Sequence, residues 1–164
     1  MTGCNQVRTA IVATFTGAGL SAVSAYDRAA GEVSSPVVSV DIGECAAVPM
    51  ALGGYLGSSW DERTGTVREL YGRQLELTVE ICVRAAAAAP CEAAAEAAAD
   101  ALESGGMPAG IRLLEQTWKA VEWDRTNHCF LRRGGAKCRA YFTASTSEEE
   151  PNLLDFILKG VLTS

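Results

Sequence analysis

The sequence is poor in the residues on which most metal and thiol sites depend. It holds a single histidine, His128, and no two of its six cysteines have the C-x-x-C spacing of a zinc or redox site. A metal needs three or four converging ligands, whereas His128 and Cys129 are neighbours that would point to opposite faces of a strand. We therefore predict no metal site. We interpret the scattered cysteines as buried small hydrophobes of a protein made in a reducing cytosol.

Motifs for phosphate binding and nucleophilic catalysis are also missing. There is no G-x-x-x-x-G-K-S/T loop and no G-x-S-x-G elbow. Gly17-Ala18-Gly19 follows a predicted helix, so it lacks the strand-to-helix context of a dinucleotide fingerprint. The paired carboxylates at 61–62 and 148–150 lie in polar stretches, whereas acid–base catalysis needs burial or a charged neighbour to separate the pKa values. We predict no enzyme and no cofactor.

The charge balance disfavours nucleic acid, and hydropathy disfavours a membrane. Net charge is -6, and the one dense cationic stretch, residues 132–139, surrounds the Gly134-Gly135 pair. No run approaches the roughly 20 apolar residues that span a bilayer, and the alanine-rich residues 85–101 are interrupted by Pro90 and by acids. The N-terminus lacks the pattern of a signal peptide. We expect neither sequence-specific nucleic-acid binding nor membrane insertion.

Hydrophobic periodicity defines two helices and one strong strand. Val7, Ile11 and Phe15 fall four apart and predict a helix over residues 6–16. Residues 74–83 alternate apolar and polar side chains for ten positions, as in a strand with one buried face. Residues 91–104 combine alanine with an acid at every fourth position, which predicts a second helix ended by Gly105-Gly106.

The remaining segments indicate further strands. Residues 20–26 and 36–42 are predicted to form a strand–loop–strand hairpin. Residues 111–123, 128–132 and 137–144 read as strands, with a polar turn at 124–127 and a bulge or bend at Gly134-Gly135. The fold class is therefore α+β, a single domain over residues 1–164 with a mixed or antiparallel sheet and helices packed on one face.

Two segments do not fit this core and are predicted to make assembly contacts. Residues 46–66 contain four glycines and are expected to form a long flexible loop, and residues 151–164 form an apolar C-terminal arm. Their bulky side chains either pack on the parent core or dock on neighbouring subunits. The predicted contact residues are Tyr55, Leu56 and Trp60 of the loop, and Leu154, Phe156 and Leu158 of the arm.

Several stretches resemble the small tail-terminator or tail-completion proteins of contractile-tailed phages and phage-derived particles. They are AGLSAVSAY (18–26), PVVSVDI (36–42), YLG (55–57), YGRQLELTVEI (71–81) and LLDFILKG (153–160). The resemblance implies a prophage-type subunit without catalytic residues, whose copies form a ring, typically a hexamer, at the end of a tail tube. Such a ring stops the growth of tube and sheath and joins the tail to the neck.

The implied partners are further copies of the chain and the tail tube, sheath or neck proteins. The implied location is the virion tail, assembled in the cytoplasm of a bacterial host. A ring closed by head-to-tail contacts needs two different complementary surfaces on each subunit, and the loop and the arm are candidates for them. One alternative is another neck, connector or baseplate component. Others are a small-molecule-binding regulatory domain, which requires a concave apolar pocket, and an enzyme with an unrecognised site, which requires a perturbed titratable group in a cleft.

Overall fold

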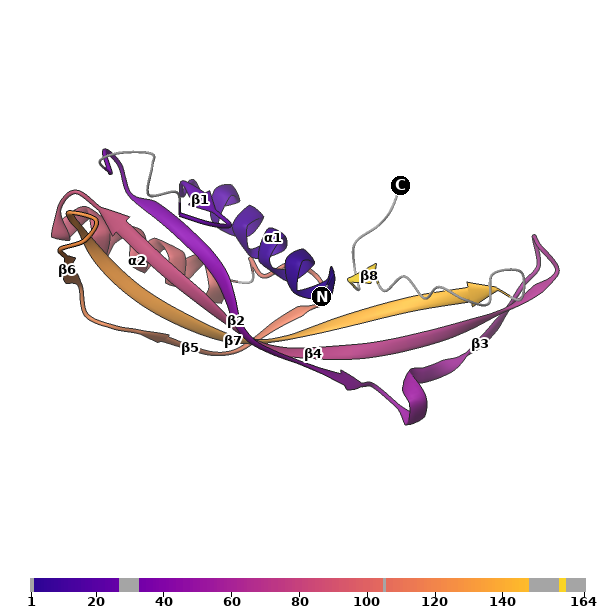
Figure 1. Ribbon diagram of the computed structural model, residues 1–164. Helices are drawn as coiled ribbons and strands as arrows, with labels where there is room; N and C mark the ends of the chain where they lie inside the picture. The colour runs from indigo at the N-terminus through magenta and orange to yellow at the C-terminus, as the bar shows by residue number, and fades with distance from the viewer. Residues whose placement is uncertain (1, 27–32, 105, 148–156, 159–164) are drawn as a thin grey trace.

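The computed structural model describes residues 2–26, 33–104, 106–147 and 157–158, and these build one mixed sheet with two helices (Figure 1). Eight strands run in the order β1-β2-β4-β7-β5, with β3 beside β4, and with β6 and β8 beside β7. β1 pairs with β2 in parallel, and every other described pairing is antiparallel. The predicted α+β class is confirmed. The elements are α1 (Thr2–Gly17), β1 (Ala22–Val23), β2 (Val37–Pro49), η2 (Leu52–Gly54), β3 (Tyr55–Asp61), β4 (Thr66–Ala85), α2 (Ala88–Glu103), β5 (Ile111–Trp118), β6 (Glu122–Asp124), β7 (Cys129–Ser147) and β8 (Ile157–Leu158).

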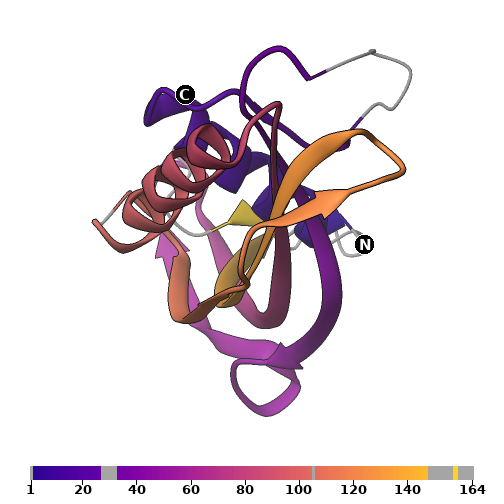
Figure 2. The ribbon, with the colours of Figure 1, turned by 90° about the vertical axis from the view of Figure 1, so that its left-hand side faces the viewer.

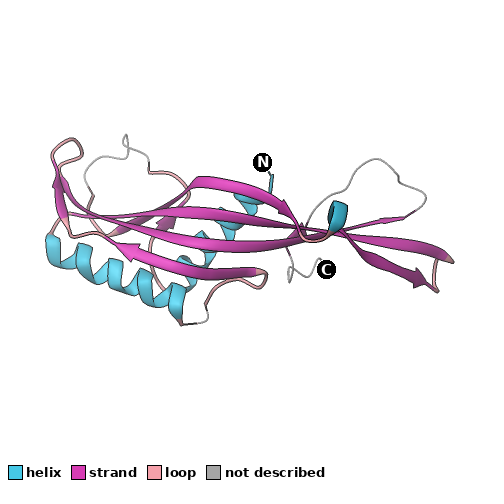
Figure 3. Cartoon of the chain, turned by 90° about the horizontal axis from the view of Figure 1, so that it is seen from below, coloured by secondary structure: helices cyan, strands magenta, loops and turns pink. Residues whose placement is uncertain are grey.

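Two long strands, β4 and β7, form the spine of the molecule. They pair without a register shift from Arg68↔Ser147 to Ala85↔Phe130. The 20 residues of β4 span roughly 65 Å at the usual rise of a strand. A helix of 16 residues, the length of α1 and of α2, spans only about 24 Å. The helices therefore cover one end of the sheet, and the other end extends beyond them (Figures 1 and 3).

The face of the sheet that carries the helices, which we call the helix face, contains the core. Because successive residues of a strand alternate faces, the odd-numbered residues of β4 from Leu75 to Val83 all point to this side and are buried. α1 covers them with its predicted residues Val7, Ile11 and Phe15, and α2 with Cys91 and a row of alanines. Both helices lie on the same side of the curved sheet (Figure 2). We call the opposite side the open face.

Both predicted helices are confirmed, each with an earlier start than expected. α1 begins at Thr2 and α2 at Ala88. Pro90 is accommodated because it lies in the first turn of α2, where a backbone N–H has no partner inside the helix. Neither helix has the length and apolar character needed to cross a membrane, and none of the described residues forms another candidate.

The predicted hairpin between residues 20–26 and 36–42 is wrong. β1 is only two residues long, and its Ala22↔Val38 and Val23↔Ser39 pairs are parallel. Parallel strands need a crossover of a dozen or more residues, and positions 24–36 are long enough to supply one. The polar composition of this segment is compatible with a hairpin loop or with a crossover, so it does not predict whether β1 is antiparallel or parallel to β2.

The predicted bend at Gly134-Gly135 is also wrong, because β7 continues through it. Ile81↔Gly134 and Glu80↔Gly135 keep the register of their neighbours. The bulges lie elsewhere, between Ile42 and Cys45 in β2, Tyr55 and Gly57 in β3, and Leu113 and Glu115 in β5. The predicted strand 111–123 is divided into β5 and β6.

The segment 46–66 is ordered structure and not a long flexible loop. It holds the end of β2, the short helix η2, and β3, which forms a hairpin with β4. Gly53 and Gly54, both with positive φ, make the turn into β3. At the hairpin tip the Asp61 carboxylate accepts hydrogen bonds from the backbone N–H groups of Arg63 and Thr64 and pairs with Arg68 at 2.7 Å.

The predicted C-terminal arm lies mostly outside the described residues. Only Ile157 and Leu158 are described, as β8, whose backbone pairs with Thr143 and Phe142 of β7. Leu154 and Phe156, two of the predicted contact residues, fall outside.

Candidate assembly surface

The part of the sheet that extends beyond the helices is an arm three strands wide. We call it the β arm, and it consists of η2, β3, residues 66–72 of β4 and residues 143–147 of β7. No described helix packs on its far end, and β3 pairs only with β4, so the other side of β3 is an open sheet edge among the described residues. Figure 3 shows it projecting from the helix-covered end of the molecule.

An apolar patch lies on the open face at the base of this arm. A Cβ added to Gly72 would lie 2.6 Å from Leu56 Cδ1 and 2.8 Å from Met50 Sδ, so both of these side chains fold over the glycine. Leu70 is two residues from Gly72 on the same strand and therefore shares its face. Val48 pairs with Gln74, which is also two residues from Gly72. We call Val48, Met50, Leu56 and Leu70 the open-face patch.

All four side chains of the open-face patch are exposed, with relative accessibilities between 37% and 41%. Isolated exposed apolar residues are ordinary, whereas a contiguous group is typical of a contact surface. Gly72 itself is buried beneath the patch, which suits close packing of the two side chains above it. The patch is thus preformed by the sheet and does not depend on a loop to order.

The helix-face side of the β arm carries aromatic residues. Tyr55 pairs with Tyr71 across the strands, with ring centroids 5.6 Å apart in an edge-to-face arrangement. Trp60 pairs with Val67 and is 63% exposed. The Tyr71 hydroxyl donates to the Glu69 carboxylate at 2.8 Å, and this hydrogen bond raises the pKa of Tyr71.

The three predicted contact residues of this segment are therefore exposed but do not form one group. Tyr55 and Trp60 lie on the helix-face side, whereas Leu56 is the extra residue of the β3 bulge and its side chain lies over Gly72 on the open face. Val48, Met50 and Leu70 were not among the predicted contact residues. If the predicted strand 36–42 is extended through residue 50, the alternation of Ala46, Val48 and Met50 places these residues on one face.

Two further exposed apolar residues lie at the opposite side of the sheet, one on each face and at different points along β7. Leu114 occupies the bulge of β5, and Trp123 lies on β6, where its ring packs edge-to-face on Phe130 at 5.0 Å. Each is 48% exposed. β5 ends the strand order, so its outer side is also an open sheet edge in the described part of the chain. We call Leu114 and Trp123 the β5–β6 edge. Every large hydrophobic residue that is exposed in the described structure belongs to this edge, to the open-face patch or to the β arm.

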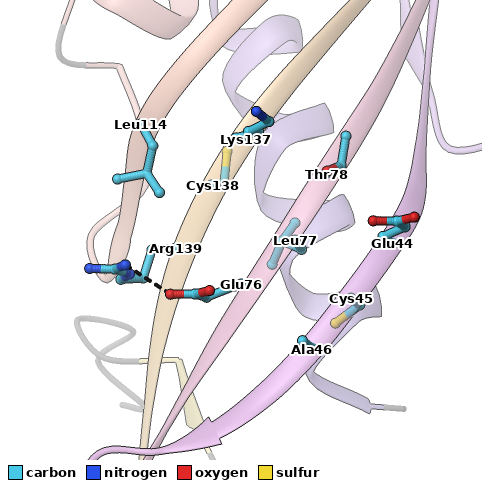
Figure 4. Close-up of a pocket in the computed structure, with 10 residues that line it drawn as sticks. All are labelled: Glu44, Cys45, Ala46, Glu76, Leu77, Thr78, Leu114, Lys137, Cys138 and Arg139. Carbon is cyan, nitrogen blue, oxygen red and sulfur yellow. Dashed lines mark hydrogen bonds and ion pairs between the residues drawn. The ribbon is translucent and has the colours of Figure 1, made fainter.

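The open face also carries a groove of about 500 Å³ between the bulges of β2 and β5 (Figure 4). Three of its four charged side chains form ion pairs: Arg139 Nη2 lies 2.8 Å from Glu76 Oε1, and Lys137 Nζ lies 2.8 Å from Oε2 of the neighbouring Glu115. The partner carboxylate raises the pKa of Lys137, so this group stays charged at neutral pH. Most of the charges that line the groove are paired, and it does not resemble an apolar pocket with a few convergent polar groups.

The residues considered for thiol or metal chemistry are dispersed. His128 is exposed in the turn before β7 with φ of 50°, whereas Cys129 beside it is fully buried. Cys138 is buried on the helix face, and burial raises the pKa of its thiol to about 11. Within the described ranges no three His, Cys, Asp or Glu side chains are grouped as metal ligands.

Comparisons with known proteins assign no family to the chain. No family model and no curated protein sequence matches it. Among solved structures, one chain of the virion of a native gene transfer agent particle is similar, with 15% sequence identity and a TM-score of 0.34 over 82% of this chain and 92% of that chain. With a TM-score this low, the match establishes neither a shared fold nor a shared function.

Proposed function

We propose that this chain is a non-catalytic structural subunit of a virion or phage-derived particle. It assembles with copies of itself into a terminator-like ring that caps a tail tube and joins it to the neck. The observation that carries the proposal is the distribution of exposed apolar side chains, which lie on the β arm with its open-face patch and, singly, along the β5–β6 edge. The sequence resemblance to tail-terminator proteins supplies the kind of assembly.

The energetics favour a partner for the open-face patch. Burying an exposed leucine or methionine completely contributes about 1.5–3 kcal/mol, and the four residues of the patch are already more than half buried in the subunit. If a neighbouring subunit covered the whole patch, the contact between the two subunits would gain a few kcal/mol of binding free energy. That gain suits a contact repeated around a ring, where every subunit contributes the same surface.

The positions of the two surfaces favour a head-to-tail contact. The β arm extends β4 on one side of the sheet, and β5 and β6 flank β7 on the other. A contact between two different surfaces leaves a free surface on each end of a dimer, so that more copies add until a ring closes. A contact between two identical surfaces would stop at a dimer. We place the β arm of one copy against the β5–β6 edge of the next.

The same surfaces would serve another neck, connector or baseplate component, which was the structural alternative from the sequence. Both readings involve a self-associating subunit, and they differ in the neighbour that the ring meets. The groove offers little support for a small-molecule-binding domain, because three of its four charged side chains are already in ion pairs.

Solution mass tests the proposal. Light scattering on the purified chain over a range of concentrations should show a monomer in equilibrium with a ring, near six subunits if the terminator resemblance holds. Because the proposed contacts are apolar, added salt should not dissociate the ring, whereas an assembly held by surface ion pairs would weaken. Electron microscopy should then show the ring on the ends of added tail tubes. A concentration-independent dimer would contradict the proposal. A ring that does not bind the ends of tail tubes would contradict the terminator role.

A further inference from the structure

Two of the six cysteines lie in contact where α1 crosses β2. Cys4 is in the first turns of α1, and Cys45 follows the bulge of β2 on the side that faces the helix. Their side chains share a hydrogen bond, and both residues are half-buried against the edge of the core. A second interaction joins the same two elements, because Arg8 of α1 lies 3.6 Å from Asp41 of β2. The helix is thus held at this position on the strand.

The other cysteines have different surroundings. Cys91, Cys129 and Cys138 are buried, and the Cys91 thiol is directed at the backbone carbonyls of Val83 and Phe130 at 3.5 and 3.7 Å. These three fit the sequence interpretation of cysteine as a small hydrophobe. Cys82 is half-buried, but its pairing with Ser39 places it on the open face, away from the helices. The Cys4–Cys45 pair is distinguished by its thiol–thiol hydrogen bond and its partial exposure, whereas Cys91 and Cys129, which also interact, are both buried.

We propose that Cys4 and Cys45 are a disulfide-forming pair that a small-molecule disulfide such as glutathione disulfide oxidises. The thiolate of one cysteine attacks a sulfur of glutathione disulfide, which forms a mixed disulfide and releases one glutathione thiolate. The second cysteine, as thiolate, then attacks the protein sulfur of that mixed disulfide and releases the second glutathione. The two protein thiols lose two protons and two electrons, and one glutathione disulfide becomes two glutathione thiols.

The surroundings of Cys45 slow the step in which its thiolate attacks at neutral pH. Burial and the hydrogen bond with Cys4 raise the pKa of Cys45 to about 11, and Arg73 on β4 opposes them. Because only the thiolate attacks a disulfide, little of Cys45 is reactive near pH 7. The rate of oxidation should therefore rise with pH above neutrality.

The crosslink would fix the N-terminal helix to the strand that leads into the β arm. It closes the chain between residues 4 and 45, so the unfolded chain loses conformational freedom and the native state gains stability. For a particle assembled in a reducing cytosol and then released, a point that rests on the proposed function, the bond would form after release. The thiol contact itself does not depend on that function.

The test uses the purified full chain, reduced and then incubated with glutathione disulfide in mildly alkaline buffer. Remaining thiols are alkylated after an acid quench, and the cysteines are mapped by mass spectrometry. Before alkylation, the expected product is lighter than the reduced chain by two hydrogen atoms. After alkylation, the peptide map should contain one crosslinked pair of peptides, joined through Cys4 and Cys45, and the other cysteines should be alkylated. Its melting temperature should be higher by about 5 °C or more, and dithiothreitol should reverse both changes.

Three variants complete the experiment. Cys4→Ser and Cys45→Ser should each abolish the crosslink and the rise in melting temperature, whereas Cys82→Ser should retain both. The proposal is overturned if Cys4 and Cys45 remain as alkylatable as the other cysteines, if oxidation stops at a mixed disulfide with glutathione, or if another pair is crosslinked. Should a serine variant fail to fold, the peptide map of the unmodified chain still decides between these outcomes.

Discussion

The indole ring of Trp118 lies over Gly134 on the neighbouring strand. A Cβ added to this glycine would come within 2.6 Å of Trp118 Cε3, closer than real contacts allow. Trp118 and Gly134 are register partners between β5 and β7, and the indole Nε1–H donates to Gln116 Oε1 at 3.1 Å. The glycine therefore gives the aromatic ring a place on the sheet. This explains why glycine occupies position 134 of β7 without a bend in the strand.

The first prediction concerns this contact. Gly134→Ala should lower the free energy of unfolding by about 1–3 kcal/mol, because the ring or the strand must shift to admit the methyl group. Gly135→Ala is the matched control, since its nearest neighbour, Thr117 Oγ1, would be 3.5 Å away. It should change stability by no more than about 0.5 kcal/mol. Equal effects of the two changes in urea unfolding would show that Trp118 does not depend on the glycine.

A second prediction tests the assignment of the two faces of β4. Ile81 is buried on the helix face and Glu80 is exposed on the open face. Ile81→Ala should cost about 2–5 kcal/mol, because it removes transfer free energy and leaves a cavity beneath the helices. Glu80→Ala should fall within about 0.5 kcal/mol of the parent chain. Chemical denaturation measures the loss of unfolding free energy in each variant. A larger loss for Glu80→Ala, or equal losses for the two variants, would contradict the assignment of the faces.

A third prediction follows from the turn between β6 and β7. The Asn127 side chain donates to the Asp124 carboxylate at 2.6 Å, and this bond, with those from the backbone N–H groups of Asn127 and Thr126, lowers the pKa of Asp124 despite partial burial. A carboxyl group with a lowered pKa in the folded state contributes stability above its ordinary pKa. That contribution is lost as the pH falls through the folded-state value.

Asp124→Ala should accordingly reduce stability by about 1 kcal/mol at neutral pH, through the loss of the turn's hydrogen bonds. The difference in stability between the variant and the parent chain should shrink below about pH 4, where Asp124 of the unfolded parent chain becomes protonated. It should vanish once the pH falls below the lowered pKa of the folded state. Asp100→Ala, on the exposed side of α2, is the control for removing a carboxylate. Melting temperatures measured as a function of pH would contradict the account if the Asp124→Ala difference stayed constant into acid.

The elements that could be predicted from the sequence are those in which one face is buried. β4 shows alternation from Leu75 to Val83 because the helices cover only its helix face, and α1 shows the spacing of Val7, Ile11 and Phe15 for the same reason. β3 gave no such signal, since none of its residues is buried. It is held by backbone pairing with β4, which leaves no side-chain pattern, and its glycines and serines therefore suggested a loop.

The candidate surface was predicted in part. The sequence identified Tyr55, Leu56 and Trp60 as bulky residues away from the core, and all three are exposed. Their separation onto two faces depends on the bulge at Leu56, and the joining of Leu56 to Met50 depends on Gly72 of another strand. Both are products of strand register, which residue types along a single segment do not encode. That any of these residues contacts a partner stays a prediction.

The central claim, a head-to-tail contact between the β arm and the β5–β6 edge, is tested most directly by mixing two variants. Leu56→Asp/Leu70→Asp removes the apolar character of the open-face patch, and Leu114→Asp/Trp123→Ser removes that of the β5–β6 edge. Each variant must first retain the circular dichroism spectrum and cooperative melting of the parent chain. Each should then be monomeric in light scattering, because burying a carboxylate in an apolar contact is costly.

In the mixture, each variant still presents one intact surface. The intact β arm of the edge variant can meet the intact β5–β6 edge of the arm variant, so we predict dimers of one copy of each, with no larger species. If the β arm instead paired with another β arm, the edge variant alone would still associate and the mixture would contain no mixed dimers. That result, or unchanged assembly of both variants, would contradict the account.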